Sequence, residues 1–239
     1  MTSVPASAGG SLAGRIAVIT GASRGIGAAV ARRFAAAGAA LGLTARTAAD
    51  LDRLAGELRA GGATVAVAVA DIAVAAEVDA AAAALVQALG GVDVVVNNAG
   101  IVLRKPTADI TDAEWRHMMA VNLDGPFYVA RAYARHLRAR RGGLINMASI
   151  AGRQGTPLLA SYCASKHGLV GLTRALAEEW RGEVAVNAIC PGSVDTDMLG
   201  QGMVGARPAM TADDVAATAL FLAADAPPAM TGACLDVFG

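Results

Sequence analysis

The sequence predicts an α/β fold: one domain built on a doubly wound parallel sheet of about seven strands with helices on both faces. Three observations support this prediction. Short apolar segments alternate with longer amphipathic segments along the chain, which is typical of β-α units. The apolar segments are continuous, as expected for strands covered on both faces. A glycine-rich segment follows the first apolar run, and right-handed crossovers between such units wind the sheet in both directions.

The elements follow from these periodicities in chain order. Runs rich in β-branched and small apolar residues predict strands at 15–20, 39–44, 64–70, 93–97, 144–147, 184–189 and 232–239. Apolar residues at helical spacing predict helices at 25–37, 48–60, 77–89, 112–140, 161–180 and 212–223. Strands and helices therefore alternate over almost the whole chain.

The chain is expected to form a single domain over residues 12–239, after a flexible N-terminal extension at 1–11. Its 239 residues suit one α/β domain, and no repeat or linker interrupts them. Residues 198–211 are rich in Gly and Met, and they follow the segment Pro191-Gly192. Because functional loops tend to lie beside sites, we interpret 198–211 as a short substrate-covering flap, an ordinary surface connection being the alternative.

Composition excludes several classes of protein. The net charge is zero and the pI is about 6.8, so neither nucleic acid nor an anionic membrane is an expected partner. No apolar run approaches the roughly 18 residues of a membrane span, and residues 1–14 lack the pattern of a signal peptide. The three cysteines are Cys163, Cys190 and Cys234. Their spacing fits neither a disulfide framework nor a metal site, which favours a reducing, cytoplasmic location.

Residues 20–27 read Thr-Gly-Ala-Ser-Arg-Gly-Ile-Gly, directly after the first predicted strand. Gly21 permits a sharp turn, Gly25 lets the backbone approach a pyrophosphate, and Gly27 lets helix pack on strand. The N-terminus of the following helix offers free N–H groups to phosphates. Glycines can also serve a tight turn alone, but in this context they indicate a Rossmann-type dinucleotide site.

The end of the second strand indicates which dinucleotide binds. NAD enzymes place a carboxylate there, whereas NADP needs a cation for its 2′-phosphate. This chain has Arg46 and Thr47 and no acid, and Arg24 of the glycine loop could reach the same phosphate. Asp71, at the end of the third strand, is placed for the adenine edge. NADP(H) is therefore the preferred cofactor, with NAD(H) as the alternative.

Tyr162 and Lys166 are four residues apart and share one helix face. A free phenol has a pKa near 10, and a nearby ammonium is expected to lower it. Tyr162 can then donate a proton to a carbonyl oxygen or accept one from an alcohol. Ser149, at the end of the fifth strand, can hold the same oxygen. A Tyr–Lys pair alone is often an exposed helix feature, so the assignment depends on the glycine loop and Ser149.

With these motifs the sequence resembles the short-chain dehydrogenase/reductase family over residues 12–239. Asn97-Asn98-Ala99-Gly100 resembles its sheet-stabilising segment. Val121-Asn122-Leu123 resembles its helix with the fourth catalytic residue, which implies a proton relay at Asn122. Residues 191–196 resemble the segment that holds the nicotinamide carboxamide. The implied cofactor-binding residues are Gly21, Ser23, Arg24, Gly25, Ile26, Gly27, Arg46, Thr47, Asp71, Ile72, Asn98, Ala99, Gly100, Tyr162, Lys166, Pro191, Gly192, Val194 and Thr196.

Within the family the chain is most similar to 3-oxoacyl-acyl-carrier-protein reductases and related ketone reductases. That resemblance implies a homotetramer or homodimer. The flap is shorter than in typical members, and Phe238 replaces the usual aspartate of the last strand, which affects the expected subunit contact.

Substrate residues are less specific. The expected pocket residues are Val102, Ile150, Leu158, Leu159, Met198 and Met203. They are apolar and imply a substrate with an apolar part. Arg138, Arg140, Arg141 and Arg181 either steer an acidic carrier protein or a CoA phosphate, or simply keep the surface soluble.

Two alternatives stay open: an NAD-dependent alcohol dehydrogenase working oxidatively, and a dinucleotide-binding sensor without turnover. An epimerase or dehydratase of the longer sister group is disfavoured, because this chain lacks the larger C-terminal region.

Overall fold

A computed structural model describes residues 10–202 and 208–238. Its sheet has the strand order β3-β2-β1-β4-β5-β6-β7, and every neighbouring pair is parallel. The order reverses between β1 and β4, the place where doubly wound sheets bind ligands. This confirms the predicted fold class. The strands are β1 Ile16–Thr20, β2 Ala40–Ala45, β3 Val65–Val69, β4 Val94–Asn97, β5 Gly143–Met147, β6 Ala185–Pro191 and β7 Cys234–Val237.

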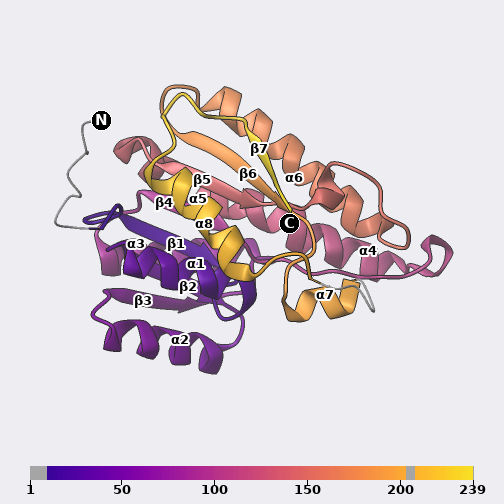
Figure 1. Ribbon diagram of the computed structural model, residues 1–239, viewed down its shortest axis with the longest axis horizontal. Helices are drawn as coiled ribbons and strands as arrows, with labels where there is room; N and C mark the ends of the chain where they lie inside the picture. The colour runs from indigo at the N-terminus through magenta and orange to yellow at the C-terminus, as the bar shows by residue number, and fades with distance from the viewer. Residues whose placement is uncertain (1–9, 203–207, 239) are drawn as a thin grey trace.

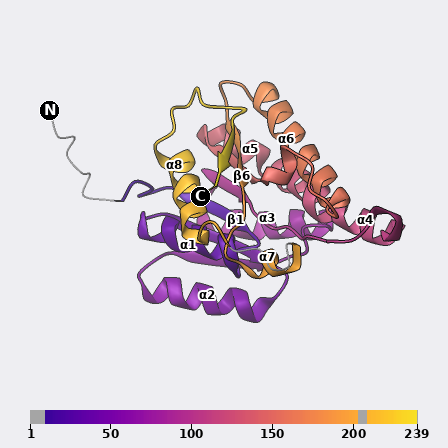
Figure 2. The same ribbon diagram turned by 45° about the vertical axis from the view of Figure 1, so that its right-hand side comes forward.

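Helices cover both faces of the sheet (Figures 1 and 2). One buried cluster joins α1, α2 and α8 to the sheet, and a second joins α3, α5 and α6 to its other face. The helices are α1 Gly25–Ala36, α2 Ala48–Ala60, α3 Ala75–Leu89, α4 Asp112–Met119, α5 Gly125–Arg140, α6 Ala160–Glu179, α7 Asp197–Gly202 and α8 Ala212–Ala224. None of the helices in the described ranges is long and apolar enough to cross a membrane.

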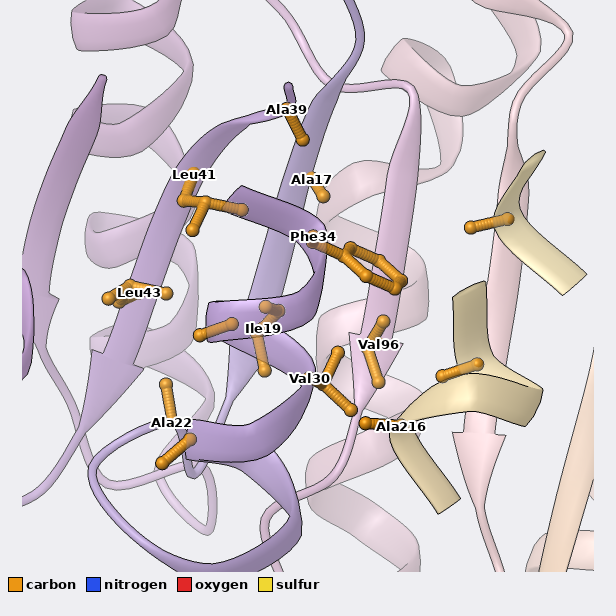
Figure 3. Close-up of a cluster of buried hydrophobic side chains, with 14 of the residues drawn as sticks. Ala17, Ile19, Ala22, Val30, Phe34, Ala39, Leu41, Leu43, Val96 and Ala216 are labelled. Atoms are coloured by element: carbon orange, nitrogen blue, oxygen red, sulfur yellow. The ribbon is translucent and has the colours of Figure 1, made fainter. Parts of the chain in front are cut away.

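Figure 3 shows how α1 is held on the sheet. Val30 and Phe34 point from α1 toward Ile19 of β1 and Val96 of β4, and Ala216 of α8 closes the same cluster. The α1 side chains of this cluster are fully buried. Each buried side chain of this size contributes about 1.5–3 kcal/mol, so α1 and the loop before it are firmly placed.

The predicted elements agree with the structure to within a few residues at their ends. The main difference lies in residues 112–140, which were expected to form one helix. A π-helical turn, η2 (Ala120–Asp124), separates α4 from α5. Such turns are rare and are frequently found at functional sites. This one carries Asn122, which points into the protein and is fully buried.

The flap expected at 198–211 contains helix α7, and residues 203–207 lie outside the described part of the chain. The expected extension at 1–11 falls mostly on residues 1–9, which also lie outside it. Leu12 is buried at the start of the core.

Candidate active site

The carboxyl ends of the strands surround one large cavity of about 1000 Å³, which we call the main cavity. Most residues expected to bind the cofactor line it. They are Gly21, Ser23, Arg24, Gly25, Ile26, Arg46, Thr47, Asp71, Ile72, Asn98, Ala99, Gly100, Tyr162, Lys166, Pro191, Gly192, Val194 and Thr196, and Ser149 lines it as well. Two expected site residues, Gly27 and Asn122, do not line the cavity and lie behind its wall.

The glycine loop needs its glycines for space and for backbone geometry. Gly21 has φ +61°, and a Cβ atom there would lie 2.7 Å from the Cα of Ala99. A Cβ at Gly27 would lie 2.3 Å from the carbonyl oxygen of Gly21. Gly25 also has a positive φ, +54°, a region that residues with side chains rarely adopt. The loop therefore keeps its backbone close to the main cavity.

Asn98 fastens this loop to strand β4. Its amide nitrogen donates to the carbonyl oxygens of Thr20 at 3.0 Å and Gly21 at 3.1 Å. In return, the hydroxyl of Thr20 accepts from the backbone N–H of Asn98 at 3.0 Å. Helix α1 then begins after Arg24 without a side-chain cap. Its first N–H groups are therefore free for an anion such as a pyrophosphate.

The other end of the main cavity lies beside helix α2. Thr47 precedes this helix and makes no side-chain capping hydrogen bond. Because Arg46 and Thr47 both line the cavity, the uncapped N-terminus of α2 is a second helix N-terminus that faces it. No ion pair within residues 10–202 and 208–238 involves Arg46. Arg24 instead contacts Asp197 of α7 at 3.1 Å. Asp50, which the sequence interpretation overlooked, also lines this end.

Tyr162 and Lys166 lie one turn apart on α6, and both are almost completely buried. Burial raises the pKa of Tyr162 above its usual value near 10, and a hydrogen bond from Ser149 lowers it by a smaller amount. The net direction differs from the expectation that Lys166 lowers this pKa. The physical reason is that burial in low dielectric disfavours the phenolate.

Lys166 is directed toward the strand next to it. Its amine donates to the carbonyl oxygen of Met147 at 2.8 Å and lies 5.7 Å from the centre of the Tyr162 ring. Burial lowers the pKa of Lys166 to about 8. A Cβ atom at Gly100 would lie 3.5 Å from this amine. Gly100 therefore leaves the lysine open toward the main cavity.

Asn122 holds the residues around this pair in place through hydrogen bonds. Its side chain exchanges two hydrogen bonds of 2.9 Å with the backbone of Ile101 and donates to the Ser165 hydroxyl at 3.1 Å. Ser165 donates in turn to the carbonyl oxygen of Tyr162 at 2.7 Å. The π-helical turn therefore ties the loop after β4 to the helix that carries Tyr162. The proton relay expected at Asn122 stays a prediction.

Comparisons with known proteins agree with this geometry. The family model described as short chain dehydrogenase matches residues 15–203. Galactitol 2-dehydrogenase (L-tagatose-forming) of Cereibacter sphaeroides is 42% identical over 95% of this chain and 95% of its own. The 3-oxoacyl-acyl-carrier-protein reductase of Pseudomonas aeruginosa is 36% identical over 96% and 98%. A short chain dehydrogenase from Burkholderia cenocepacia, solved in complex with NADP, is 32% identical, with a TM-score of 0.89 over 95% of this chain and 98% of that one.

The chain belongs to the short-chain dehydrogenase family. It is an oxidoreductase that acts on CH–OH and C=O groups. The similarity to a 3-oxoacyl-acyl-carrier-protein reductase supports membership of this family and does not identify the substrate.

The substrate end of this short-chain dehydrogenase is mostly apolar. Of the residues expected there, Val102, Ile150, Leu159 and Met198 line the main cavity, and Met203 lies outside the described residues. Leu158 does not line it: its backbone is left-handed, with φ +65°, and the residue is 39% exposed. Sequence reasoning missed further lining residues, among them Gln154, Leu199, Gln201 and Phe238.

The arginines considered for steering a carrier protein lie away from the main cavity, and the steering role stays a prediction. Arg138 and Arg140 are in the last turn of α5, next to the edge where the strands begin. The main cavity is at the opposite edge. Arg138 pairs with Glu179 and Glu183, Arg140 with Asp93, and Arg181 with Glu178. The charges of these three arginines are therefore matched locally.

Proposed function

We propose that this short-chain dehydrogenase is an NADP(H)-dependent reductase of ketones or 3-oxoacyl thioesters. The observation that carries the proposal is the convergence of Ser149, Tyr162 and Lys166 on one wall of the main cavity. Ser149 lowers the pKa of the Tyr162 phenol against the effect of burial, and the Lys166 amine lies 5.7 Å from the centre of the Tyr162 ring. That set can hold a carbonyl oxygen and supply its proton, which a protein that only binds a dinucleotide does not need.

The proposed roles follow from the protonation states. The raised pKa of Tyr162 keeps its phenol protonated at neutral pH, as a proton donor requires. Ser149 would hold the carbonyl oxygen through its hydroxyl. Lys166 would place a positive charge behind the phenol while Met147 holds its amine. NADPH, when bound, would supply the hydride. The protonated phenol is the form that gives its proton to the carbonyl oxygen during reduction.

The cofactor assignment is supported by the shape and charge of the site. Gly21 and Gly25 line the main cavity without side chains and with positive φ, and two helix N-termini face the same cavity. Arg46 stands beside the second of them, where a 2′-phosphate would gain a guanidinium and free N–H groups. These features fit NADP(H), the cofactor bound in the Burkholderia cenocepacia structure.

Asp50 favours a second candidate, an NAD-dependent alcohol dehydrogenase working oxidatively. Its carboxylate lines the same end of the main cavity as Arg46, and a carboxylate there suits a ribose hydroxyl better than a phosphate. We favour NADP(H). Arg46 and Thr47 precede α2, at the helix N-terminus where a 2′-phosphate would bind, whereas Asp50 lies further along, within the first turn of the helix. A sensor without turnover is disfavoured because the three catalytic candidates are assembled.

The remaining expectations stay proposals. The free cysteines, two of them buried, support a reducing cytoplasm. A homotetramer or homodimer is implied by the family resemblance. An acyl thioester is supported by the apolar residues that line the main cavity, whereas the locally paired Arg138, Arg140 and Arg181 give a carrier protein no support.

The test is the variant Tyr162→Phe, measured by NADPH oxidation with diacetyl as the ketone. Removing the hydroxyl should lower kcat by about a hundred- to ten-thousandfold, while the Kd for NADPH changes less than about threefold. Tyr128→Phe is the matched control, because Tyr128 lies on α5 and does not line the main cavity. Retained turnover in Tyr162→Phe would refute the assignment.

A further inference from the structure

Phe238 is an exposed aromatic residue that faces the main cavity. It follows β7 directly, lines the cavity and is 57% exposed. Single exposed hydrophobic residues are common on protein surfaces and need no explanation. An aromatic ring that is exposed because it borders a cavity is different, since a ligand can cover it. The sequence interpretation treated Phe238 only as a change in a subunit contact.

The register of the last two strands indicates which side of the cavity the ring occupies. Asp236 is paired with Cys190 on β6, and its carboxylate contacts Arg153 at 3.5 Å. Arg153 follows the short helix η3 (Ile150–Gly152), which begins directly after Ser149. Because alternate residues of a strand share a face, Phe238 continues the side on which Asp236 lies. Phe238 is therefore expected on the side of β7 that faces the loop after Ser149.

Gly192 supplies the second contact. The N–H of Gly192 donates to the carbonyl oxygen of Val237 at 2.9 Å, which joins the ends of β6 and β7. A Cβ atom at Gly192 would lie 3.4 Å from the Cβ and Cδ1 atoms of Phe238. The phenylalanine therefore packs over this glycine, within the segment that lines the main cavity beyond β6.

Other apolar residues line the cavity that Phe238 borders. Among them are Ile150, Leu159 and Met198, so the ring of Phe238 adds aromatic surface to a cavity that already has apolar lining. Aromatic rings prefer to pack in offset or edge-to-face geometry, with a gain beyond simple burial. A flat apolar group beside a carbonyl would use this surface, whereas a methyl group would leave it exposed.

We infer that Phe238 is a specificity-determining residue, which selects carbonyl compounds that carry a flat or bulky apolar group next to the reacting carbon. This inference rests on the proposed function, because it concerns the substrate of the same site. It assigns Phe238 no part in proton transfer.

The experiment compares two ketones that differ in one group. Diacetyl has two methyl ends, and its phenyl analogue has a phenyl ring in place of one methyl. The variants are Phe238→Ala, which removes the ring, and Phe238→Leu, which keeps part of the apolar surface. Phe221→Ala is the matched control, because Phe221 is 41% exposed on α8 and does not line the main cavity. Each protein is assayed for kcat and KM with both ketones.

For the phenyl diketone, Phe238→Ala should lower kcat/KM about tenfold, mainly through KM. For diacetyl, kcat/KM should change less than about threefold, because the aromatic contact is not used. Phe238→Leu should be intermediate, and Phe221→Ala should leave both values unchanged. An equal loss with both ketones would indicate a structural role and overturn the inference, as would no loss with either.

A binding measurement separates this inference from the proposed reaction. With NADP⁺ present no ketone is reduced, so thermal protection by the phenyl diketone reports binding alone. Greater protection of the wild type than of Phe238→Ala supports the inference even where neither ketone is turned over, an outcome that would count against the proposed reductase activity. Equal protection of the two proteins, or none, overturns the inference.

Discussion

Position 46 is where a single side chain should decide between the two nicotinamide cofactors. Arg46 lines the main cavity next to Thr47, and its guanidinium has no ion-pair partner in the described ranges. Arg46→Asp replaces attraction for a 2′-phosphate by repulsion. We expect kcat/KM with NADPH to fall about ten- to a hundredfold, as for loss of hydrogen bonds to a charged group. The value with NADH should rise or stay unchanged, as measured by steady-state kinetics with both cofactors.

The matched control is Arg53→Asp, which changes an arginine on the exposed side of the same helix. It alters the net charge equally but lies outside the main cavity. If both variants lost activity with NADPH to the same extent, the effect would be a general one of charge. An unchanged preference in Arg46→Asp would assign the phosphate to another group.

At the scale of elements, helix α7 is joined to the glycine loop. Arg24 and Asp197 pair at 3.1 Å, with side chains 69% and 73% exposed. A Cβ atom at Gly25 would lie 3.4 Å from Thr196, the residue before α7. An arginine occupied in this way is expected to hold the loop and the flap together. It would then affect both dinucleotides alike, unlike the phosphate contact expected from the sequence.

The corresponding prediction concerns Arg24→Gln and Asp197→Asn. Each should raise the Kd for NADPH and for NADH by the same factor, at most about fivefold for an exposed pair. The double variant should lose no more than either single one. Fluorescence titration with both cofactors measures these values. A loss confined to NADPH in Arg24→Gln would show instead that Arg24 binds the 2′-phosphate.

The elements themselves were largely predictable, because each strand is a continuous apolar run and each helix an apolar stripe. The π-helical turn at Ala120–Asp124 was not, since its residues also suit an ordinary helix and only packing of Asn122 on Ile101 and Ser165 distinguishes it. The same holds for Leu158, whose left-handed backbone no sequence pattern announces. The candidate site was predictable where it depends on short motifs. The Arg24–Asp197 pair joins residues 173 positions apart, and Phe238 meets Gly192 only through the sheet, so neither could be read from local sequence.

For the whole molecule, the buried lysine links the site to the stability of the fold. Burial lowers the pKa of Lys166 to about 8 in the folded protein, whereas the pKa of an exposed lysine, as in the unfolded chain, is 10.5. The unfolded chain therefore binds more protons than the folded one between these two pH values. Under the linkage relation, the free energy of unfolding then rises with pH across this window, by at most about 1.4 kcal/mol per pH unit. Below pH 8 both forms are protonated, and the contribution is constant.

Lys166→Met removes this titration and leaves the other groups in place. Relative to the wild type, the variant should therefore lose stability steadily as pH rises from about 8 to about 10.5, as measured by urea unfolding at several pH values. The slope is the decisive quantity, because loss of the hydrogen bond to Met147 shifts the variant by a constant amount at every pH. Parallel curves for the two proteins would mean that Lys166 titrates in the fold as it does in the unfolded chain. A falling difference would mean that the fold keeps a buried ammonium at neutral pH at the expense of stability, which agrees with the catalytic role that we propose for Lys166.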